Sequence, residues 1–453
     1  MTRLKGLRTV AFAIAGLLST NAHATGDEDP FLFGDQANLL GGAVTASIRD
    51  TAAIWYNPAG LAQNNRARID VSGTALTVRL REIPAGLSLD LPSGRVDESI
   101  ESHRAYVVPT TLAVAREITQ GVILGLGLFV TEQDLTSFVR SVQLTDSTIN
   151  LDLAGALTGT VIRYHVGLSL GYQINSRLRV GATLFGVYED THEFRKLFAN
   201  ASFTNGMYQS TFFQRLVDAS TTRYGAELLA GAQLDVGHGW ELGLTARSPR
   251  LIVQENAVTD NSTALISTGM NAPTVAFSAV DHTPIGAEGT GFTRPPRFTL
   301  AAAKQAGSIE VSAEAELRPS GFGPTSERTV INGRSGVLWK VTDQTQLGLG
   351  IFTNRSGAGE PAHFPDYRVD YYGLSAGFKH QKVVGLHASE HAPSLLLSTT
   401  IAVRYAIGLG DSTRIRFDFR DAPNTGLVGR VDDERVNVVY HDISLYLGTG
   451  LDF

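Results

Sequence analysis

Two-residue alternation of apolar and polar side chains recurs along this chain of 453 residues and constrains its fold more than any other feature. Between 308 and 317, Ile309 and Val311 share one face of an extended segment, while Glu310 and Glu316 share the other. Alternation of this kind is typical of a β-strand with one apolar and one polar face. After residue 24 the chain holds no apolar run near the ~20 residues of a membrane-spanning helix. The sequence therefore predicts an all-β protein.

The alternating segments number about fourteen, an even number, as in single-chain outer-membrane barrels. We expect strands near 66–81, 104–118, 121–132, 160–174, 177–190, 222–236, 239–253, 294–306, 308–319, 331–342, 344–355, 367–381, 395–410 and 435–453.

Short and long connections alternate between these strands. We expect tight turns near 119, 175, 238, 307 and 343, and long loops at 82–103, 133–159, 191–221, 254–293, 320–330, 356–366 and 411–434. Outer-membrane barrels have short periplasmic turns and long external loops. The connection 382–394 is the one exception. The pattern predicts a membrane β-barrel of about fourteen antiparallel strands. A soluble, exported β-protein is the alternative, since its half-buried strands alternate in the same way.

The first 24 residues have the pattern of a secretory signal peptide. Arg3, Lys5 and Arg8 precede a short apolar core, and Ala22-His23-Ala24 supplies a small-x-small cleavage site. We therefore expect export to the outer membrane of a Gram-negative bacterium. The whole chain carries a net charge of −6 and no basic run, which argues against nucleic-acid binding. It has no cysteine, so disulfides and thiolate sites are excluded.

A stretch rich in Gly and Ala, residues 41–62, precedes the first strand. It is apolar enough to be buried, yet it is broken by Asn57-Pro58. Proline cannot donate a ladder hydrogen bond, and the residue before it is pushed away from the helical region. This segment is therefore expected to form small coils and turns that pack inside something larger. We assign 25–65 to a tail and plug, and 66–453 to the barrel.

Asn57-Pro58-Ala59, followed by Gly60 and preceded by Asp50, resembles the N-terminal plug of the FadL/TodX family. The resemblance covers roughly residues 38–62 and implies a plug, or hatch, inside a fourteen-stranded barrel. It implies a channel for long-chain fatty acids or aromatic hydrocarbons, with gating by these five residues and lateral release through the wall. The chain end, Tyr446 to Phe453, resembles the signal that the barrel-assembly machinery recognises. Lipopolysaccharide and outer-membrane lipid are expected neighbours.

The expected loop 191–221 is unusually rich in large apolar side chains. In the family that the plug resembles, the third and fourth external loops form a groove that captures hydrophobic substrate. By order, 191–221 and 254–293 match those loops, and packing over the barrel mouth is an alternative role. The candidate capture residues are Phe194, Leu197, Phe198, Phe203, Met207, Tyr208, Phe212 and Phe213.

Arg247 and Arg404 alternate with apolar neighbours, so both are expected to face the lumen. There they are candidates to hold a substrate carboxylate. Pairing with a lumen acid such as Glu227 or Glu314 is the favoured interpretation.

Catalysis is not expected. His387, Glu390 and His391 match a zinc-protease pattern that requires a helix, but they lie in a polar connection before Pro393. We predict no catalytic residue, no metal and no cofactor. The predicted function is passive uptake of hydrophobic small molecules, whether fatty acid, alkane or aromatic. The alternative is a barrel of the same fold that serves as a scaffold or shuttle for surface or secreted proteins.

Overall fold

A computed structural model describes residues 29–63, 67–145, 147, 149–204, 208–269, 275–285, 291–322, 327–362, 364, 366–384, 395–420 and 430–453. The predicted signal peptide lies outside the described residues, as do His387, Glu390 and His391.

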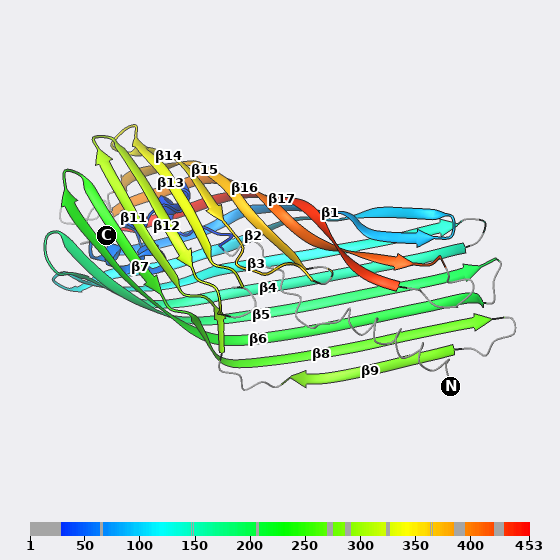
Figure 1. The fold of residues 1–453 in the computed structure, drawn as a ribbon. Helices are drawn as coiled ribbons and strands as arrows, with labels where there is room; N and C mark the ends of the chain where they lie inside the picture. Colours follow the sequence, from blue (N-terminus) through cyan, green and yellow to red (C-terminus); the bar gives the residue numbers. More distant parts are fainter. Residues whose placement is uncertain are drawn as a thin grey trace.

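One sheet of seventeen strand elements makes up nearly all of the described chain (Figure 1). Its elements are β1 (Arg68–Leu91), β2 (Gly94–Thr119), β3 (Val122–Thr145), β4 (Ile149–Gln173), β5 (Leu178–Phe203), β6 (Tyr208–Gly237), β7 (Trp240–Arg247), β8 (Arg250–Gly269), β9 (Val275–Ile285), β10 (Gly291–Arg294), β11 (Arg297–Ala306), β12 (Ile309–Arg318), β13 (Val330–Lys340), β14 (Thr345–Asn354), β15 (Tyr367–Val384), β16 (Leu395–Asp418) and β17 (Arg430–Asp452).

Two wall strands are interrupted: β7 and β8 are separated at Ser248-Pro249, and β10 and β11 at Pro295-Pro296. Since β7–β8 and β9–β11 each act as one wall strand, the sheet is a fourteen-stranded antiparallel barrel. It closes where β1 pairs with β17, from Arg68 opposite Asp452 to Leu80 opposite His441. The predicted barrel and its strand number are confirmed.

Aromatic side chains mark an apolar belt around the outside. Tyr164, Tyr188 and Tyr224 are cross-strand neighbours, with ring centroids 6.1 and 5.4 Å apart. Along β4, exposed apolar side chains alternate from Tyr164 to Tyr172, a length that suits a transmembrane strand of ~9–11 residues. Trp240 and Trp339 are exposed at the level where the short turns begin. This is the surface expected of a barrel wall in lipid.

The connections at one end are short, as predicted, and the chain's C-terminus lies at this short-turn end (Figure 1). At the other end, the expected loops 320–330 and 356–366 are confirmed, whereas four others are wrong. Residues assigned to loops at 82–103, 133–159, 191–221 and 254–293 lie mostly in β-hairpins that continue far beyond the belt. The loop 411–434 is also too long, because β16 continues to Asp418 and β17 begins at Arg430.

The error has a physical cause. Beyond the lipid, the outer face of a strand meets water, so it needs no apolar side chains. Glu101, His103 and Arg104 in β2 are therefore exposed members of a strand, although their charges favoured a loop.

These long hairpins form two layers, which we call the tower. One layer contains β3, β4, β5, β6, β8 and β9, and the other contains β2, β1, β17 and β16; Figure 1 shows β16 and β17 crossing above the first layer. The layers separate because β2 and β3 pair only between Thr111–Thr119 and Val122–Phe129. An apolar cluster fills the space between them. We call it the tower core; it includes Leu89, Phe138, Leu151, Phe203, Phe213, Phe417 and Tyr440.

The plug comprises the short helices α2 (Asp35–Leu39) and α3 (Ala53–Tyr56) and the 3-10 helix η1 (Pro58–Gln63). Helix α2 contacts β13 to β17, while η1 contacts β3 to β6 on the opposite side of the bore. Most plug residues are buried, and Figure 1 shows the segment inside the short-turn end. No helix within the described ranges is long and apolar enough to cross a membrane.

Candidate ligand path and plug

Asn57 fixes the turn at the centre of the plug. Its side-chain amide donates to the Thr45 carbonyl at 2.8 Å and to the Ala232 carbonyl of β6 at 3.1 Å, and its amide oxygen accepts from Ala59 N. Gly60 then lies against Ile48, where a Cβ atom would stand 2.8 Å from the Ile48 Cγ2. This turn is buried at all four of its residues, Asn57, Pro58, Ala59 and Gly60. Its contacts therefore connect it both to other parts of the plug and to the barrel wall.

Inward-facing glycines of the wall form a cradle for the plug backbone. A Cβ atom on Gly243 would stand 2.5 Å from the Thr45 carbonyl oxygen, and one on Gly336 would stand 2.6 Å from that of Leu40. A Cβ on Gly181 would lie 2.5 Å from the Pro58 carbonyl carbon. Glycine is therefore required at these wall positions, because only a residue without a side chain lets two backbones approach this closely.

Buried charges hold the N-terminal part of the plug. The Asp35 carboxylate forms an ion pair with Lys379 of β15 at 3.0 Å. Burial acts to raise the pKa of Asp35, but Lys379 and Arg68 outweigh it and lower that pKa. At the start of the plug, Asp29 pairs with Arg297 at 2.9 Å and with Arg318. These arginines, together with Arg334, overcome burial and hold the pKa of Asp29 well below its usual value.

Asp50 behaves differently from the other plug carboxylates. Its Oδ1 accepts from Ala52 N at 3.0 Å at the start of α3. Burial and the neighbouring Asp70 charge raise its pKa to about 6, against the opposing effect of Arg68. Among Asp29, Asp35 and Asp50, it is therefore Asp50 whose pKa is raised rather than lowered.

A band of ion pairs crosses the bore between the plug and the tower core, and we call it the ionic belt. Arg250 pairs with Glu227 at 2.6 Å and with Glu189 at 3.3 Å, while Arg163 pairs with Glu189 at 2.6 Å. The other members are Glu132, His165, Arg223, Arg247, Glu255 and Arg294.

Arg247 faces the bore, as predicted, and pairs with Glu227 at 3.2 Å. It also donates to the Trp55 carbonyl oxygen at 2.7 Å and lies over the Trp55 ring, 4.1 Å from its centroid. Its guanidinium therefore joins the ionic belt to the plug. The favoured interpretation of an internal ion pair with Glu227 is confirmed.

Arg404 also faces the bore but pairs with neither predicted acid. It donates to the Pro30 carbonyl oxygen at 2.7 Å and lies 4.3 Å from the centroid of the Phe352 ring. Glu314 instead accepts from Val44 N and Thr45 N, both at 3.1 Å, and pairs with Arg334. Pairing of Arg404 with Glu314 is therefore wrong, because the plug backbone occupies both partners.

Four aromatic rings meet where the plug faces the ionic belt. The centroid of Trp55 lies 5.0 Å from Phe33, 5.5 Å from Phe129 and 5.4 Å from Phe185. A cavity of about 50 Å³ borders this cluster and is also lined by Tyr56. Phe33, Phe129 and Phe185 are at most 2% exposed, so the rings form a packed apolar cluster, and Trp55 is its member that lines the cavity beside charged side chains such as Arg297 and Glu316.

The predicted capture residues divide between two faces of the β5–β6 hairpin. Phe203 and Phe213 lie in the tower core, and Leu197 packs against it. Phe198 and Phe212 lie at outward positions of the alternating strands and form an edge-to-face pair 5.4 Å apart. Phe194 occupies another outward position. Met207 and the side chain of Tyr208 lie outside the described part.

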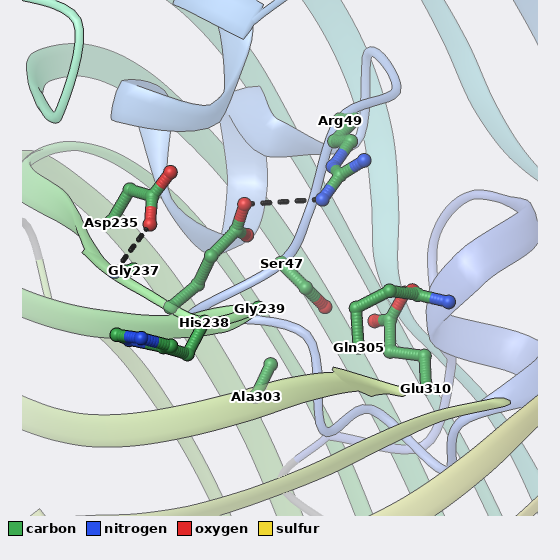
Figure 2. A pocket seen from close by; sticks show the side chains of 10 residues that line it. Ser47, Arg49, Asp235, Gly237, His238, Gly239, Ala303, Gln305 and Glu310 are labelled. Carbon is green, nitrogen blue, oxygen red and sulfur yellow. Dashed lines mark hydrogen bonds and ion pairs between the residues drawn. The ribbon is translucent and has the colours of Figure 1, made fainter. Parts of the chain in front are cut away.

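A second cavity, of about 160 Å³, opens beneath the plug at the short-turn end (Figure 2). Ser47 and Arg49 of the plug face Ala303, Gln305 and Glu310 of the wall across it. Arg49 forms an ion pair with Glu241 at 3.1 Å, which joins the plug to β7. The bore is thus hollowed on both sides of the plug.

Comparison with solved structures identifies this architecture. A FadL homologue of Pseudomonas aeruginosa matches 94% of this chain and 100% of its own length, with a TM-score of 0.61 and 13% identity. The chain has the FadL/TodX fold.

Two hydrocarbon transporters share the fold. The toluene transporter TodX of P. putida has a TM-score of 0.56 at 13% identity, covering 94% of this chain and 99% of TodX. The toluene transporter TbuX of Ralstonia pickettii has a TM-score of 0.52 at 12% identity, covering 93% of this chain and 98% of TbuX. No family model matches the sequence, and no curated protein does. The FadL/TodX likeness of this barrel is thus one of fold.

Sequence reasoning identified Glu227 and Arg247 of the ionic belt but missed its other members and the aromatic cluster of this FadL-fold barrel. Arg163 and His165 are inward members of β4, and their two-residue spacing was the available signal. Trp55 and Phe185 carried no such signal, because their contact depends on how the plug is seated. Within the described ranges, no group of three His, Asp or Glu side chains could hold a metal ion.

Proposed function

We propose that this protein is an outer-membrane channel for passive uptake of hydrophobic compounds. The observation that carries the proposal is the tower core, an apolar cluster enclosed by the barrel's own extensions rather than facing lipid. Hydrophobic molecules cross the lipopolysaccharide layer poorly, whereas an apolar interior stabilises them by ~25 cal/mol per Å² of apolar area buried. A ligand enters between the two tower layers and then reaches the cavity beside Trp55.

Release through the wall is part of the proposal. At the tower-side rim of the apolar belt, beyond Thr111 and Phe129, the ladder between β2 and β3 ends, and side chains bridge the seam instead. Tyr106 of β2 donates to the Gln133 carbonyl oxygen of β3 at 2.9 Å, and Asp134 of β3 pairs with Arg79 at 2.8 Å and Arg81 at 3.0 Å, both of β1, the strand beyond β2. Side-chain bridges separate at lower cost than a continuous ladder. The plug closes the bore below the seam, so the ligand leaves sideways. Asp50 and residues Asn57 to Gly60 keep the plug seated.

A scaffold for surface or secreted proteins is the second candidate, supported by the outward pair Phe198 and Phe212. With Ile266, which is 40% exposed, they place apolar side chains on the outside of the tower, beyond the apolar belt. Exposed apolar patches often mark protein interaction sites.

The two functions are separated by matched double variants on one hairpin. Phe203→Ser/Phe213→Ser alters the tower core, whereas Phe198→Ser/Phe212→Ser alters only the outer face. Uptake of a labelled long-chain fatty acid and of labelled toluene is measured in whole cells, with heat-modifiable gel mobility as the check on barrel assembly. We expect the inner variant to lose most uptake and the outer variant to retain it. Unchanged uptake in an assembled inner variant would contradict the channel.

A further inference from the structure

The tip of the β1–β2 hairpin leaves the barrel wall. Beyond Leu80, β1 no longer pairs with β17, and residues 87–90 pair instead with residues 415–418 of β16. This pairing is parallel, while the other strand pairings of the sheet are antiparallel. Because residues 415–418 of β16 also remain paired with β17, the tip crosses β17 and lies along the other edge of β16 rather than within the wall.

Both faces of this tip are buried. Leu87, Leu89 and Leu91 are at most 6% exposed and belong to the tower core. On the opposite face, Ser88 is 0% exposed and Asp90 is 6% exposed. A wall strand at this height would have one face in water, so residues 86–91 form an interior strand that covers the apolar core.

The tip has a discrete bend at its base. Between Ile83 and Leu87 the register with β2 shifts, and Ala85 has a φ of 48°, in the left-handed region. Non-glycine residues seldom adopt this conformation, and Pro84 and Gly86 flank it. A bulge with such a backbone supplies a point about which the rest of the hairpin can turn.

Few backbone contacts hold the tip in place besides those within its own hairpin. Residues 87–91 pair with residues 94–98 of β2, which belong to the same hairpin. Four register pairs join the tip to β16, together with an Asp90–Arg416 ion pair and the Phe419 N–H donating to the Asp90 carbonyl oxygen at 2.8 Å. By contrast, β16 pairs with β17 along its whole length from Leu396 to Asp418. Segments with few backbone bonds open at lower free energy than the rest of a structure.

We propose that residues 86–91 form a lid, which swings at Pro84-Ala85-Gly86 together with its β2 partners 94–98 to admit apolar ligands to the tower core. This inference rests on the proposed uptake function for its purpose, although the motion itself is independent of transport. In the closed state, the three leucines occupy the space where a ligand would bind, and the Asp90–Arg416 pair is the latch.

Engineered disulfides test the lid directly, because the chain has no cysteine of its own. Leu87→Cys/Ile415→Cys joins register partners of the tip and β16, leaving the latch intact. Ser202→Cys/Ser210→Cys joins partners of β5 and β6 and is the matched control. We expect oxidation to lower uptake of the labelled fatty acid or toluene at least tenfold in the first variant, with recovery on reduction, and to leave the control unchanged. Full uptake by a completely crosslinked tip would overturn the lid.

Thiol labelling separates the lid from the transport function. Ser88→Cys is compared with Ser375→Cys, a wall position that is 1% exposed, using a water-soluble maleimide. Opening predicts at least tenfold faster labelling at position 88, and faster still when Asp90→Asn removes the latch. Labelling as slow as at position 375 in both backgrounds would contradict the lid. If neither wild-type nor reduced variant takes up a probe, the channel proposal fails, and the labelling rates still decide the lid.

Discussion

The amide oxygen of Asn57 lies so close to Gly231 of β6 that a Cβ atom at that position would clash with it. The Asn57 amide nitrogen meanwhile donates to the carbonyl oxygen of Ala232, the residue next to that glycine. A turn of the plug and a strand of the wall thus meet at a distance that only glycine allows.

Gly231→Val is expected to displace the plug while the barrel still assembles. The added side chain overlaps the Asn57 amide, and overpacking of this kind costs ~1–3 kcal/mol or more. The measurement is maleimide labelling of Ser47→Cys, a plug position that is 1% exposed. Gly186→Val is the control, since a Cβ at that strand position meets nothing within 4 Å. Equal protection of Ser47→Cys in all three backgrounds would show that the cradle does not position the plug.

Glu227→Gln is expected to destabilise the barrel by ~3–5 kcal/mol, because it leaves buried Arg247 and Arg250 without their shared carboxylate. Glu255→Gln, at a partly exposed side chain in the same ionic belt, is expected to cost ~1 kcal/mol or less. Urea midpoints of the folded protein in detergent measure both. Similar midpoints for the two variants would argue against the buried pairing as a source of stability.

Asp134→Asn tests the seam between β2 and β3. The change removes the charge that joins β3 to Arg79 and Arg81, so the seam is expected to open more readily. If lateral release limits uptake, labelled toluene enters several-fold faster. Asp97→Asn is the control, because Asp97 pairs with Arg95 on the exposed part of β2, away from the seam. Uptake that is unchanged or slower in Asp134→Asn would speak against release at this seam.

The barrel could be predicted from the sequence because its outer face meets lipid. The lipid-facing positions of β3 that Leu124, Leu126 and Leu128 occupy require apolar side chains. The two-residue period is therefore visible in the sequence itself. The tower could not be predicted in the same way. Its strands face water on one side, and Asp97 or Glu98 is as suitable there as in a loop.

The candidate site was predicted only in part. Asn57-Pro58 indicated the plug turn because its backbone restrictions are local. Arg404 was placed correctly in the bore, but its partner is a plug carbonyl, and backbone carbonyls carry no residue-specific signal. Phe198 faces outward and Phe203 faces the tower core because they lie on opposite faces of one strand. The faces could not be assigned while the segment was interpreted as a loop.

The stability of the seated plug is expected to rise as pH falls from 7.5 to 5, because Asp50 has a folded-state pKa of about 6. A carboxyl group with a raised pKa destabilises the folded state when ionised, and protonation relieves this between about pH 6 and the unfolded value near 3.9. Besides Asp70, the groups that act on it are Arg68, Asp35 and Lys379. The expected gain by pH 5 is ~1 kcal/mol. Asp50→Asn retains an oxygen that can accept from Ala52 N, so it should be more stable than wild type at pH 7.5 and lose the dependence. Thermal unfolding at both pH values measures this, and an equal pH response in the two proteins would show that Asp50 is not the titrating group.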